Sequence, residues 1–445
     1  MGENVACSSR TLAGGALLVG LCLAALCLAA KPPAQTPART EVRMWTLLSG
    51  GDGERMRALV DGFNASQQGA RVVTTTLTWG ETFYTKVMTA SSVGAGPDLV
   101  TVHLSRLANL VGAETLRPLS QAELEAAGIH PGDFYPRLMA KAAWRGTLYA
   151  VPLDTHALVL YYNKNLLGKA GLLDTKGAMK PLEGMAAFTD ALRLVKERTG
   201  AQGLTMECSP NAVTPWRVWL SLLAQRGAAI IEGKHFAYGK AGEETLAAMS
   251  NWFAMGYARR GLDYPASTSQ FMSGKAGFMI NGVWEVPALV SSATTSPDAF
   301  AYGVAPLPRL YDNASVWGDS HALALPANAG HPMPSAKVAA ALQFVAYVSR
   351  HSLSWAKGGH IPANMAVAES PAAQALVPNN AYAASVARNV VYDPDGWYAG
   401  AAGPLQTSSS KFLPAALSGQ LTPGRALSMF EAEAGKLLVR SQPKP

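Results

Sequence analysis

The sequence predicts an α/β fold, because strand-like apolar segments alternate with amphipathic helices along most of the chain. Runs rich in β-branched residues, such as ARVVTTTLTW at 70–79, indicate strands, and apolar residues at helical spacing, as in GMAAFTDALRLVKERTG at 184–200, indicate helices. The chain has 445 residues, of which 49% are hydrophobic and only 15% charged, so it can form sizeable cores. We therefore expect α/β layers with mostly parallel sheets.

The first 40 residues differ from the rest of the chain. Arg10 precedes an apolar run at 11–30 that ends in small residues, and the polar segment KPPAQTPART follows at 31–40. This pattern is typical of an export signal cleaved after Ala30, but an apolar run of about 20 residues is also long enough for an uncleaved membrane anchor. We assign residues 1–30 to a signal peptide or anchor and 31–40 to a linker, and we expect a periplasmic protein.

The stretch MWTLLSGGDGERMRALVDGFN at 44–64 predicts a short strand, a glycine-rich turn and a helix. The turn lacks the third glycine of a dinucleotide-binding fingerprint and the Gly-Lys-Ser/Thr end of a P-loop, which disfavours a phosphate site. Two interpretations remain. Ser49 or Asp52 caps the helix, or Ser49, Gly50 and Asp52 offer hydrogen-bonding groups to the hydroxyls of a ligand.

The later elements follow in chain order. Strands are expected at 70–79, 97–104 and 275–286 and, broken near 152–154, at 146–167, and helices at 82–96, 184–200, 243–258 and 335–350. The chain is expected to cross between two lobes near 152–154, 303–308 and 349–352. The predicted lobes are therefore discontinuous, with residues 41–153 plus 305–350 in lobe 1, residues 154–304 plus 351–445 in lobe 2, and a cleft between them.

Composition and motifs disfavour several functions. The net charge is +7, but Lys and Arg are scattered, with no run longer than Arg259-Arg260, so we expect no nucleic-acid partner. A nucleophile elbow and a His-Glu-x-x-His motif are both missing, and the eight histidines never stand at i, i+4 spacing. We expect no cofactor and no metal. Two carboxylates from Asp154, Glu285 and Asp319 could still meet across a cleft, so a glycoside hydrolase remains an alternative.

Several tryptophans stand at strand ends or in loops that contain glycine or proline. Aromatic faces offer flat apolar surface to a ligand, and nearby polar groups fix its orientation, a combination that suits sugar rings. Any one of these tryptophans is more often a core residue, but together they favour a carbohydrate ligand. They are Trp79, Trp216, Trp284, Trp317 and Trp397.

Seven segments in order are similar to the extracellular solute-binding proteins of bacterial carbohydrate ABC transporters, a group that includes maltose- and trehalose-binding proteins. They are LVDGFNAS at 59–66, GPDLVTVHLSRL at 96–107, GTLYAVPLDTHALVLYYNKNLL at 146–167, FMSGKAGFMINGVWEV at 271–286, YGVAPLP at 302–308, GDSHALALP at 318–326 and WAKGGHIPAN at 355–364. The resemblance covers nearly all of 41–440. It implies a two-lobe periplasmic-binding-protein fold of type II, with hinge strands and a ligand cleft between the lobes.

The resemblance also implies ligand-binding residues at the matched motifs. They are Ser49, Gly50, Asp52, Trp79, His103, Ser105, Arg106, Asp154, His156, Trp216, Trp284, Gly318, Asp319, Asn364 and Trp397. Relatives often have an acidic residue near His103–Arg106 or at the position of His156. Many relatives have arginine at the position of Asn364. Because this chain differs at these positions, the identity of the sugar stays open.

The function that the resemblance implies is that of a non-catalytic, monomeric binding protein. It would capture a mono- or disaccharide, such as maltose or trehalose, and deliver it to the permease subunits of an ABC importer. A glycerol-phosphate-type solute is an alternative, and it would need a basic anchor such as Arg106.

Overall fold

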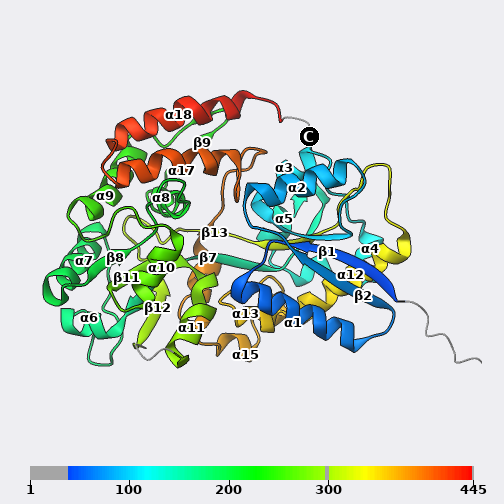
Figure 1. The fold of residues 1–445 in the computed structure, drawn as a ribbon, viewed down its shortest axis with the longest axis horizontal. Coiled ribbons are helices and arrows are strands. Elements are labelled where there is room, and N and C mark those ends of the chain that lie inside the picture. The colour runs from blue at the N-terminus through cyan, green and yellow to red at the C-terminus, as the bar shows by residue number, and fades with distance from the viewer. Residues whose placement is uncertain (1–38, 296–299, 443–445) are drawn as a thin grey trace, which may run out of the picture. The chain divides into compact units, whose positions relative to one another are not determined.

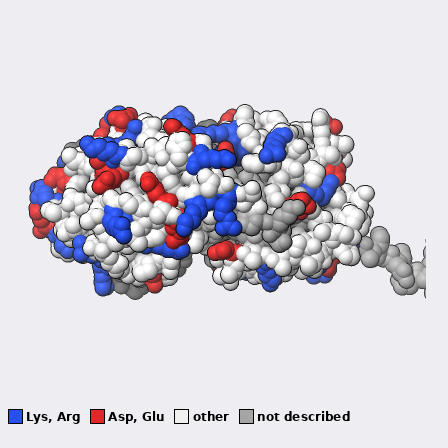
Figure 2. Space-filling model, turned by 90° about the horizontal axis from the view of Figure 1, so that it is seen from above, with Lys and Arg blue, Asp and Glu red and all other residues white. Residues whose placement is uncertain are grey.

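The computed structural model describes residues 39–295 and 300–442 (Figure 1). The segment that we interpret as a signal peptide or anchor lies outside these residues, and the chain from Thr40 onward forms one compact unit. None of the helices in the described part is long and apolar enough to cross a membrane. On the face shown in Figure 2, basic and acidic side chains are interspersed.

Two separate hydrophobic cores define two lobes in this unit. The first core contains residues from 42–153 and 322–348, together with Trp355 and Ala363. The second core contains residues from 157–317, together with Ile361 and residues from 382–434. Each lobe is therefore built from segments that lie far apart in the sequence.

The first lobe contains a five-stranded sheet with the strand order β2-β1-β3-β14-β6. β1 is parallel to β2 and β3, whereas β14 is antiparallel to β3 and β6. Its elements are β1 (Thr40–Thr46), α1 (Gly50–Ser66), β2 (Ala70–Thr76), α2 (Glu81–Ser92), β3 (Leu99–His103), η1 (Leu104–Arg106), α3 (Leu107–Gly112), α4 (Gln121–Ala126), η2 (Pro131–Asp133), α5 (Pro136–Lys141), β4 (Ala143–Trp144), β5 (Thr147–Leu148), β6 (Ala150–Pro152), β14 (His321–Ala324) and α12 (Ser335–Arg350).

The second lobe contains a sheet with the strand order β16-β13-β7-β11-β8, and β12 and β15 also pair with β7. Its elements are β7 (Asp154–Asn163), α6 (Lys164–Ala170), α7 (Met185–Thr199), β8 (Gln202–Thr205), α8 (Thr214–Gln225), β9 (Ile231–Glu232), β10 (His235–Phe236), α9 (Gly239–Ala254), α10 (Tyr264–Met272), β11 (Ala276–Gly282), η3 (Val283–Glu285), α11 (Val286–Thr295), β12 (Tyr302–Pro306), β13 (Val316–Asp319), α17 (Pro404–Leu417) and α18 (Pro423–Val439).

A connecting region follows α12 and contains short elements that contact both lobes. They are α13 (Leu353–Ala356), β15 (Ile361–Pro362), α14 (Met365–Ala368), α15 (Pro371–Gln374), η4 (Asn379–Ala381), α16 (Ala383–Asn389) and β16 (Val390–Val391).

Strand β7 organises the second sheet, because it changes partner along its length. Its first residues pair with β15, the next with β13, and its C-terminal half with β11 on one side and β12 on the other. All ten residues of β7 are buried, as expected for a central strand rich in β-branched and aromatic residues. In Figure 1, β7 and β13 run between the elements of the first lobe and those of the second.

Two expectations from the sequence are wrong in detail. The sheets are mixed rather than mostly parallel, because β7 and β14 are antiparallel to most of their partners. Alternation of strands and helices does not report strand direction, and a chain that returns through a hinge strand needs no helical crossover. Residues 305–317 also belong to the second lobe, because Leu307, Leu310 and Trp317 pack in its core. The second crossing therefore lies at Asp319–His321, where β13 ends and β14 begins.

Candidate functional site

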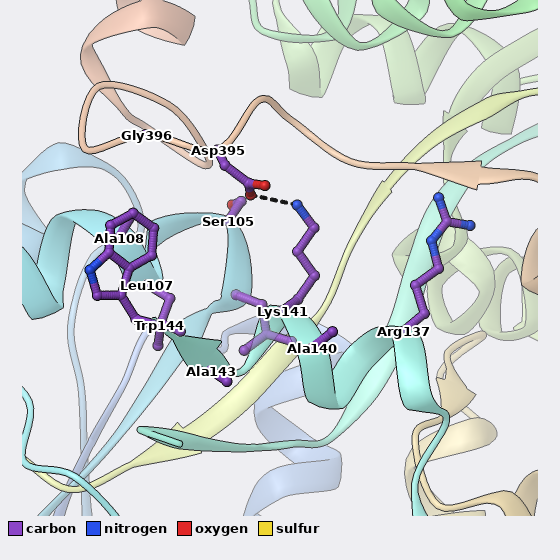
Figure 3. A pocket seen from close by; sticks show the side chains of 11 residues that line it. Ser105, Leu107, Ala108, Arg137, Ala140, Lys141, Ala143, Trp144, Asp395 and Gly396 are labelled. Atoms are coloured by element: carbon purple, nitrogen blue, oxygen red, sulfur yellow. Dashed lines mark hydrogen bonds and ion pairs between the residues drawn. The ribbon is translucent and has the colours of Figure 1, made fainter. Parts of the chain in front are cut away.

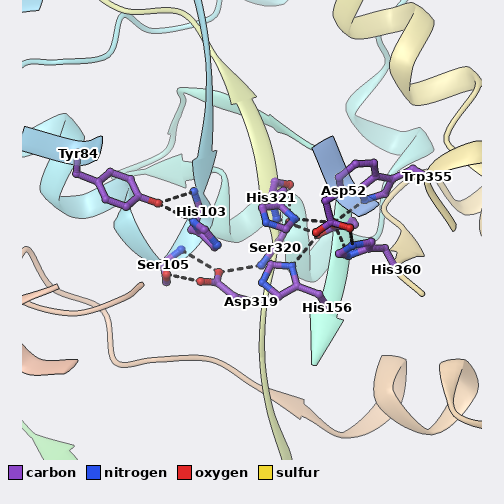
Figure 4. Close-up of polar contacts among 11 residues, drawn as sticks. Asp52, Tyr84, His103, Ser105, His156, Asp319, Ser320, His321, Trp355 and His360 are labelled. Atoms are coloured by element: carbon purple, nitrogen blue, oxygen red, sulfur yellow. Dashed lines mark hydrogen bonds and ion pairs between the residues drawn. The ribbon is translucent and has the colours of Figure 1, made fainter. Parts of the chain in front are cut away.

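A buried polar cluster lies where the chain crosses between the two sheets (Figure 4). Asp319 at the end of β13 is the register partner of His156 on β7, and His321 at the start of β14 is the register partner of His103 on β3. Directly opposed residues of antiparallel strands have neighbouring side chains. The segment Asp319-Ser320-His321 thus brings groups from both sheets together.

Asp154, at the start of β7, is fully buried and accepts hydrogen bonds from several groups. The backbone N–H and Nδ1 of His321 lie 2.9 and 2.8 Å from its oxygens, Nδ1 of His156 lies at 3.1 Å and Nε1 of Trp355 at 2.7 Å. Nδ1 of His360 lies 3.1 Å from Oδ2. Burial alone would raise the pKa of Asp154, but the three histidines hold this pKa well below its ordinary value. Asp154 is therefore an anion that orients three imidazoles.

His360 connects two carboxylates of different elements. Its Nε2 lies 2.9 Å from Oδ1 of Asp52 on α1, its Nδ1 faces Asp154, and its ring stacks on Trp355 with a centroid distance of 4.6 Å. Burial lowers the pKa of His360, but the charges of Asp52 and Asp154 outweigh this effect and raise the pKa to about 10. His360 is therefore a cation at neutral pH.

His103 and His156 are neutral imidazoles. Burial, reinforced by nearby His321, lowers the pKa of both rings, that of His156 to about 4. Nδ1 of His103 lies 2.6 Å from the hydroxyl of Tyr84. Among the described residues, the Nε2 atoms of His103 and His156 have no hydrogen-bond partner, whereas both Nδ1 atoms do.

Asp319 is fully buried and faces the first lobe through Ser105. Its Oδ1 accepts hydrogen bonds from the backbone N–H groups of Ser105 and Ser320 at 3.2 and 2.8 Å, and its Oδ2 accepts one from the Ser105 hydroxyl. Burial raises the pKa of Asp319 to about 6 despite these bonds. This carboxylate therefore lacks a fully compensating positive charge.

Trp284 lies at the edge of this cluster, directly after β11. Its Nε1 donates a hydrogen bond of 2.6 Å to the hydroxyl of Tyr264, which in turn contacts the carboxylate of Glu285. The indole is half-buried, with the His156 ring 5.8 Å away edge-on and the Arg217 guanidinium 5.2 Å from its centre. Trp284 is therefore held from several sides beside the hinge while part of its surface stays accessible.

Two buried arginines have unsatisfied N–H groups near the cluster. Arg106 of the first lobe donates a hydrogen bond to Asn109 and lies over the ring of Tyr84, but its Nε and Nη1 have no partner among the described residues. Arg217 of α8 lies over Trp317, and its Nε also has no hydrogen-bond partner among the described residues. Buried donors are usually satisfied, so these N–H groups would each gain a hydrogen bond from an acceptor placed within reach.

A cavity of about 240 Å³ adjoins the cluster through Ser105 (Figure 3). Leu107, Trp144 and Lys141 of the first lobe line it, together with Asp395 from the segment that follows β16. Nζ of Lys141 lies 2.6 Å from Asp395 at its rim. The cavity is smaller than the roughly 300–1,000 Å³ typical of drug-sized ligands, so it suits a small solute.

Several residues expected in the site lie elsewhere. Trp216 is fully buried in the second core, where its ring packs near Trp219 and Phe430 and its Nε1 donates to Asp393. Asn364 accepts a hydrogen bond from Val367 as the N-cap of α14. Both side chains have structural contacts that account for them.

The remaining expected residues are spread over the surface and the hinge. Ser49 and Gly50 are exposed at the start of α1, and Trp79 is 38% exposed after β2. Trp397 donates a hydrogen bond to the carbonyl of Arg440. Gly318 lies in the hinge, where an added Cβ would come within 2.6 Å of the His156 carbonyl oxygen, so it allows close strand packing.

The cluster also contains residues that the sequence motifs do not predict. His321 and His360 lie inside the matched segments GDSHALALP and WAKGGHIPAN, and Arg217 follows Trp216. The missing signal was the register: His321 faces His103, and His360 directly precedes the strand that pairs with Asp154. Tyr84 and Trp355 gave no separate signal, because both occupy apolar helical positions.

Two lobes with separate cores, joined by crossing strands and enclosing a polar cluster at the junction, define a periplasmic-binding-protein fold of type II. The model of the bacterial extracellular solute-binding protein family matches residues 49–352, and the chain belongs to this family. The two-lobe fold and the family that the sequence predicted are both confirmed.

Two solved structures illustrate the similarity. The GacH receptor of Streptomyces glaucescens, known unliganded and with acarbose, has a TM-score of 0.76 and 22% identity over 90% of this chain and 98% of its own. Maltose-bound MalE3 of T. maritima has a TM-score of 0.76 and 19% identity over 90% of this chain and 100% of its own. At these identities the likeness establishes the fold alone.

Curated relatives match over a shorter stretch. The sn-glycerol-3-phosphate-binding periplasmic protein UgpB of Yersinia pestis is 26% identical over 185 residues, and that of Pectobacterium atrosepticum is 26% identical over 171 residues. The matched stretch covers 41% of this chain and 41% of the Yersinia protein, and 38% of each chain for the Pectobacterium protein.

Proposed function

We propose that the protein is the substrate-binding component of a carbohydrate ABC importer, exported to the periplasm and active as a monomer. It captures a mono- or disaccharide between its lobes and delivers it to the permease subunits in the membrane. The observation that carries this proposal is the half-buried indole of Trp284, which lies beside a buried polar cluster at the junction of the lobes.

The geometry supports capture by closure. A sugar beside Trp284 would meet an aromatic face and, close by, the imidazoles of His103 and His156 and the carboxylate of Asp319. These groups come from strands of both sheets, so a ligand that contacts all of them would stabilise the form in which the lobes meet. The GacH receptor binds acarbose and MalE3 binds maltose in the same fold, which supports a carbohydrate here.

A thermal-shift screen with mono- and disaccharides tests the proposal. A ligand at 100 times its dissociation constant should add about 2.7 kcal/mol to the free energy of unfolding. We expect one sugar class to raise the melting temperature and isothermal titration to give one site per chain. No response to any sugar, with a response to a phosphorylated compound, would contradict the carbohydrate proposal.

A second candidate is a glycerol-phosphate-type solute, and the unsatisfied N–H groups of Arg106 and Arg217 favour it. Guanidinium groups bind phosphate strongly because they combine charge with several donors. The UgpB relatives are named for sn-glycerol 3-phosphate. Titration with sn-glycerol 3-phosphate and with glycerol separates the candidates: binding of the phosphate ester that is lost in Arg217→Gln would support an anionic solute.

We propose that the protein binds without catalysis. A glycosidase needs one carboxyl group as a proton donor and a second as a nucleophile or base. Both oxygens of Asp154 accept hydrogen bonds, which leaves this residue poorly placed for either role. Product analysis after prolonged incubation with oligosaccharides tests the point, and turnover that Asp154→Asn abolishes would favour the hydrolase instead.

A further inference from the structure

We propose that His103, His156 and Asp319 form a binding site for a divalent transition-metal ion at the junction of the lobes. One ligand-capable atom from each residue lies within 4.8 Å of those of the other two, and all three side chains are buried. The proposal goes beyond solute capture and does not depend on which solute the protein binds.

The two imidazoles are oriented so that one nitrogen of each stays free within the described part of the chain. Nδ1 of His156 is engaged by Asp154 at 3.1 Å and Nδ1 of His103 by the Tyr84 hydroxyl at 2.6 Å, so each Nε2 remains for another partner. Metal-binding histidines typically have a hydrogen-bond partner on the second ring nitrogen that fixes the ring, as Asp154 does for His156 and the Tyr84 hydroxyl does for His103. Neither Nε2 has a protein partner among the described residues.

Asp319 has room for one more partner. Its oxygens accept three hydrogen bonds, from Ser105 twice and Ser320 once, which leaves lone-pair capacity for a further contact. The carboxylate is fully buried, and a bound cation would supply the charge that this environment lacks.

A neighbouring set, Asp154, His156, His321 and His360, also brings its ligand-capable atoms together. Here Asp154 itself explains the close contacts, because it accepts hydrogen bonds from Nδ1 of His156 and His321 and forms an ion pair with His360. Asp154 therefore orients the ring of His156 and is not itself proposed as a ligand. His321, whose ring centroid is 4.3 Å from that of His156, is the nearest further imidazole.

The ligand set indicates the kind of ion. Two imidazoles and one carboxylate suit Zn²⁺, Ni²⁺, Co²⁺ or Cu²⁺, whereas Mg²⁺ and Ca²⁺ prefer oxygen ligands. Three protein ligands leave coordination positions open to water or to a polar group of a solute. His103 belongs to the sheet of the first lobe and the other two ligands to that of the second, so a bound ion would join the lobes.

The test uses the purified protein after removal of metal with a chelator and without added solute. We expect isothermal titration with Zn²⁺ to give one site per chain and Co²⁺ to produce a visible d–d absorption band. Loss of groups that orient metal ligands typically costs about 10–100-fold in affinity, so Tyr84→Phe should fall in that range and His103→Ala and Asp319→Asn should lose more. His235→Ala and His331→Ala, which alter exposed histidines, are the matched controls.

Far-UV circular dichroism with chelator present verifies that each variant is folded. If a ligand variant does not fold, X-ray absorption of zinc bound to the wild-type protein still tests the proposal, because it must report imidazole and oxygen neighbours. Absence of stoichiometric binding to the wild type, or binding that survives His103→Ala and Asp319→Asn as well as it survives the control changes, would overturn it. Solute binding measured with chelator present remains a separate readout of the proposed transport function.

Discussion

Trp284 is the residue whose replacement best separates a ligand contact from a structural one. If its accessible face stacks on a sugar, Trp284→Ala should weaken binding by about 30- to 900-fold, since truncating an aromatic anchor costs roughly 2–4 kcal/mol. The melting temperature without ligand should fall less than that of a variant lacking a fully buried tryptophan, because the indole is only half-buried. Isothermal titration and thermal unfolding of the same preparation provide both measurements.

Trp216→Ala is the matched control for Trp284→Ala. Because this ring is fully buried in the second core, its loss should cost about 3–5 kcal/mol in folding stability. A Trp284 variant that behaves in the same way, with a much lower melting temperature and unchanged affinity of the folded fraction, would return Trp284 to the core.

His360 allows a test of the buried charges. Removing one partner of a buried ion pair typically costs about 3–5 kcal/mol, because the remaining charge is left uncompensated. His360→Ala should therefore destabilise the protein by that amount through Asp154 and Asp52, measured by urea unfolding with chelator present. His235→Ala removes an exposed histidine and should change stability by less than about 0.5 kcal/mol. Equal effects of the two changes would show that the contacts of His360 contribute little.

Cys208 is 2% exposed, and burial raises the pKa of its thiol to about 11. The thiolate is the reactive form, so a rise of roughly two units from 9 reduces its population at pH 8 by about 100-fold. Alkylation by iodoacetamide should therefore be slow in the native protein and should reach the normal rate in urea. Rapid labelling of the native protein, followed by mass spectrometry, would contradict the buried position.

Strand β11 ends in Gly282, and the lack of a side chain there leaves room for the indole of Trp284. The indole folds back over Gly282, where an added Cβ would lie 2.1 Å from ring atoms. Gly282→Ala should therefore displace the ring, with an overpacking cost of about 1–3 kcal/mol, and weaken ligand binding as Trp284→Ala does. Gly435→Ala in α18, where a Cβ meets no atom within 4 Å, is the control. Unchanged affinity in Gly282→Ala would mean that the ring position does not matter for binding.

At the level of elements, the sequence predicts where strands and helices lie along the chain but not which strands pair. Composition and spacing predict the hinge after Pro152 and the apolar strand that follows, and β6 and β7 lie there. Composition and spacing do not predict strand direction or register, because both depend on partners far away in the chain. For the same reason the sequence predicts Asp154, His156 and Asp319 only one by one. His321 and His360 join them through strand pairing, which places His321 opposite His103 and His360 directly before the strand that pairs with Asp154.

For the whole molecule, Gly51 allows a close contact between the two lobes. An added Cβ there would lie 2.6 Å from the ring of Pro287 in α11, and the residue is not in the left-handed region, so alanine changes only this contact. Gly51→Ala should favour separated lobes and weaken solute binding by about 5- to 150-fold, which corresponds to about 1–3 kcal/mol. Small-angle X-ray scattering with and without ligand measures the separation.

Gly132→Ala is the control for this change, because Gly132 is in the same lobe and its Cβ would meet no atom within 4 Å. It should leave both affinity and scattering unchanged. If Gly51→Ala binds solute with wild-type affinity, the contact between α1 and α11 does not limit closure.

The segment Asp319-Ser320-His321 leaves the chain no freedom in length. Asp319 is fixed opposite His156 in one sheet, and two residues later His321 is fixed opposite His103 in the other. Side chains alternate between the two faces of a strand. One residue inserted or deleted at Ser320 would therefore turn every side chain of β14 to the wrong face, or shift the register between β13 and β7. The one-residue spacer between positions 319 and 321 thus fixes the register of the two sheets relative to each other. A natural variant of this protein must therefore preserve this spacing even where it replaces Asp319 or His321.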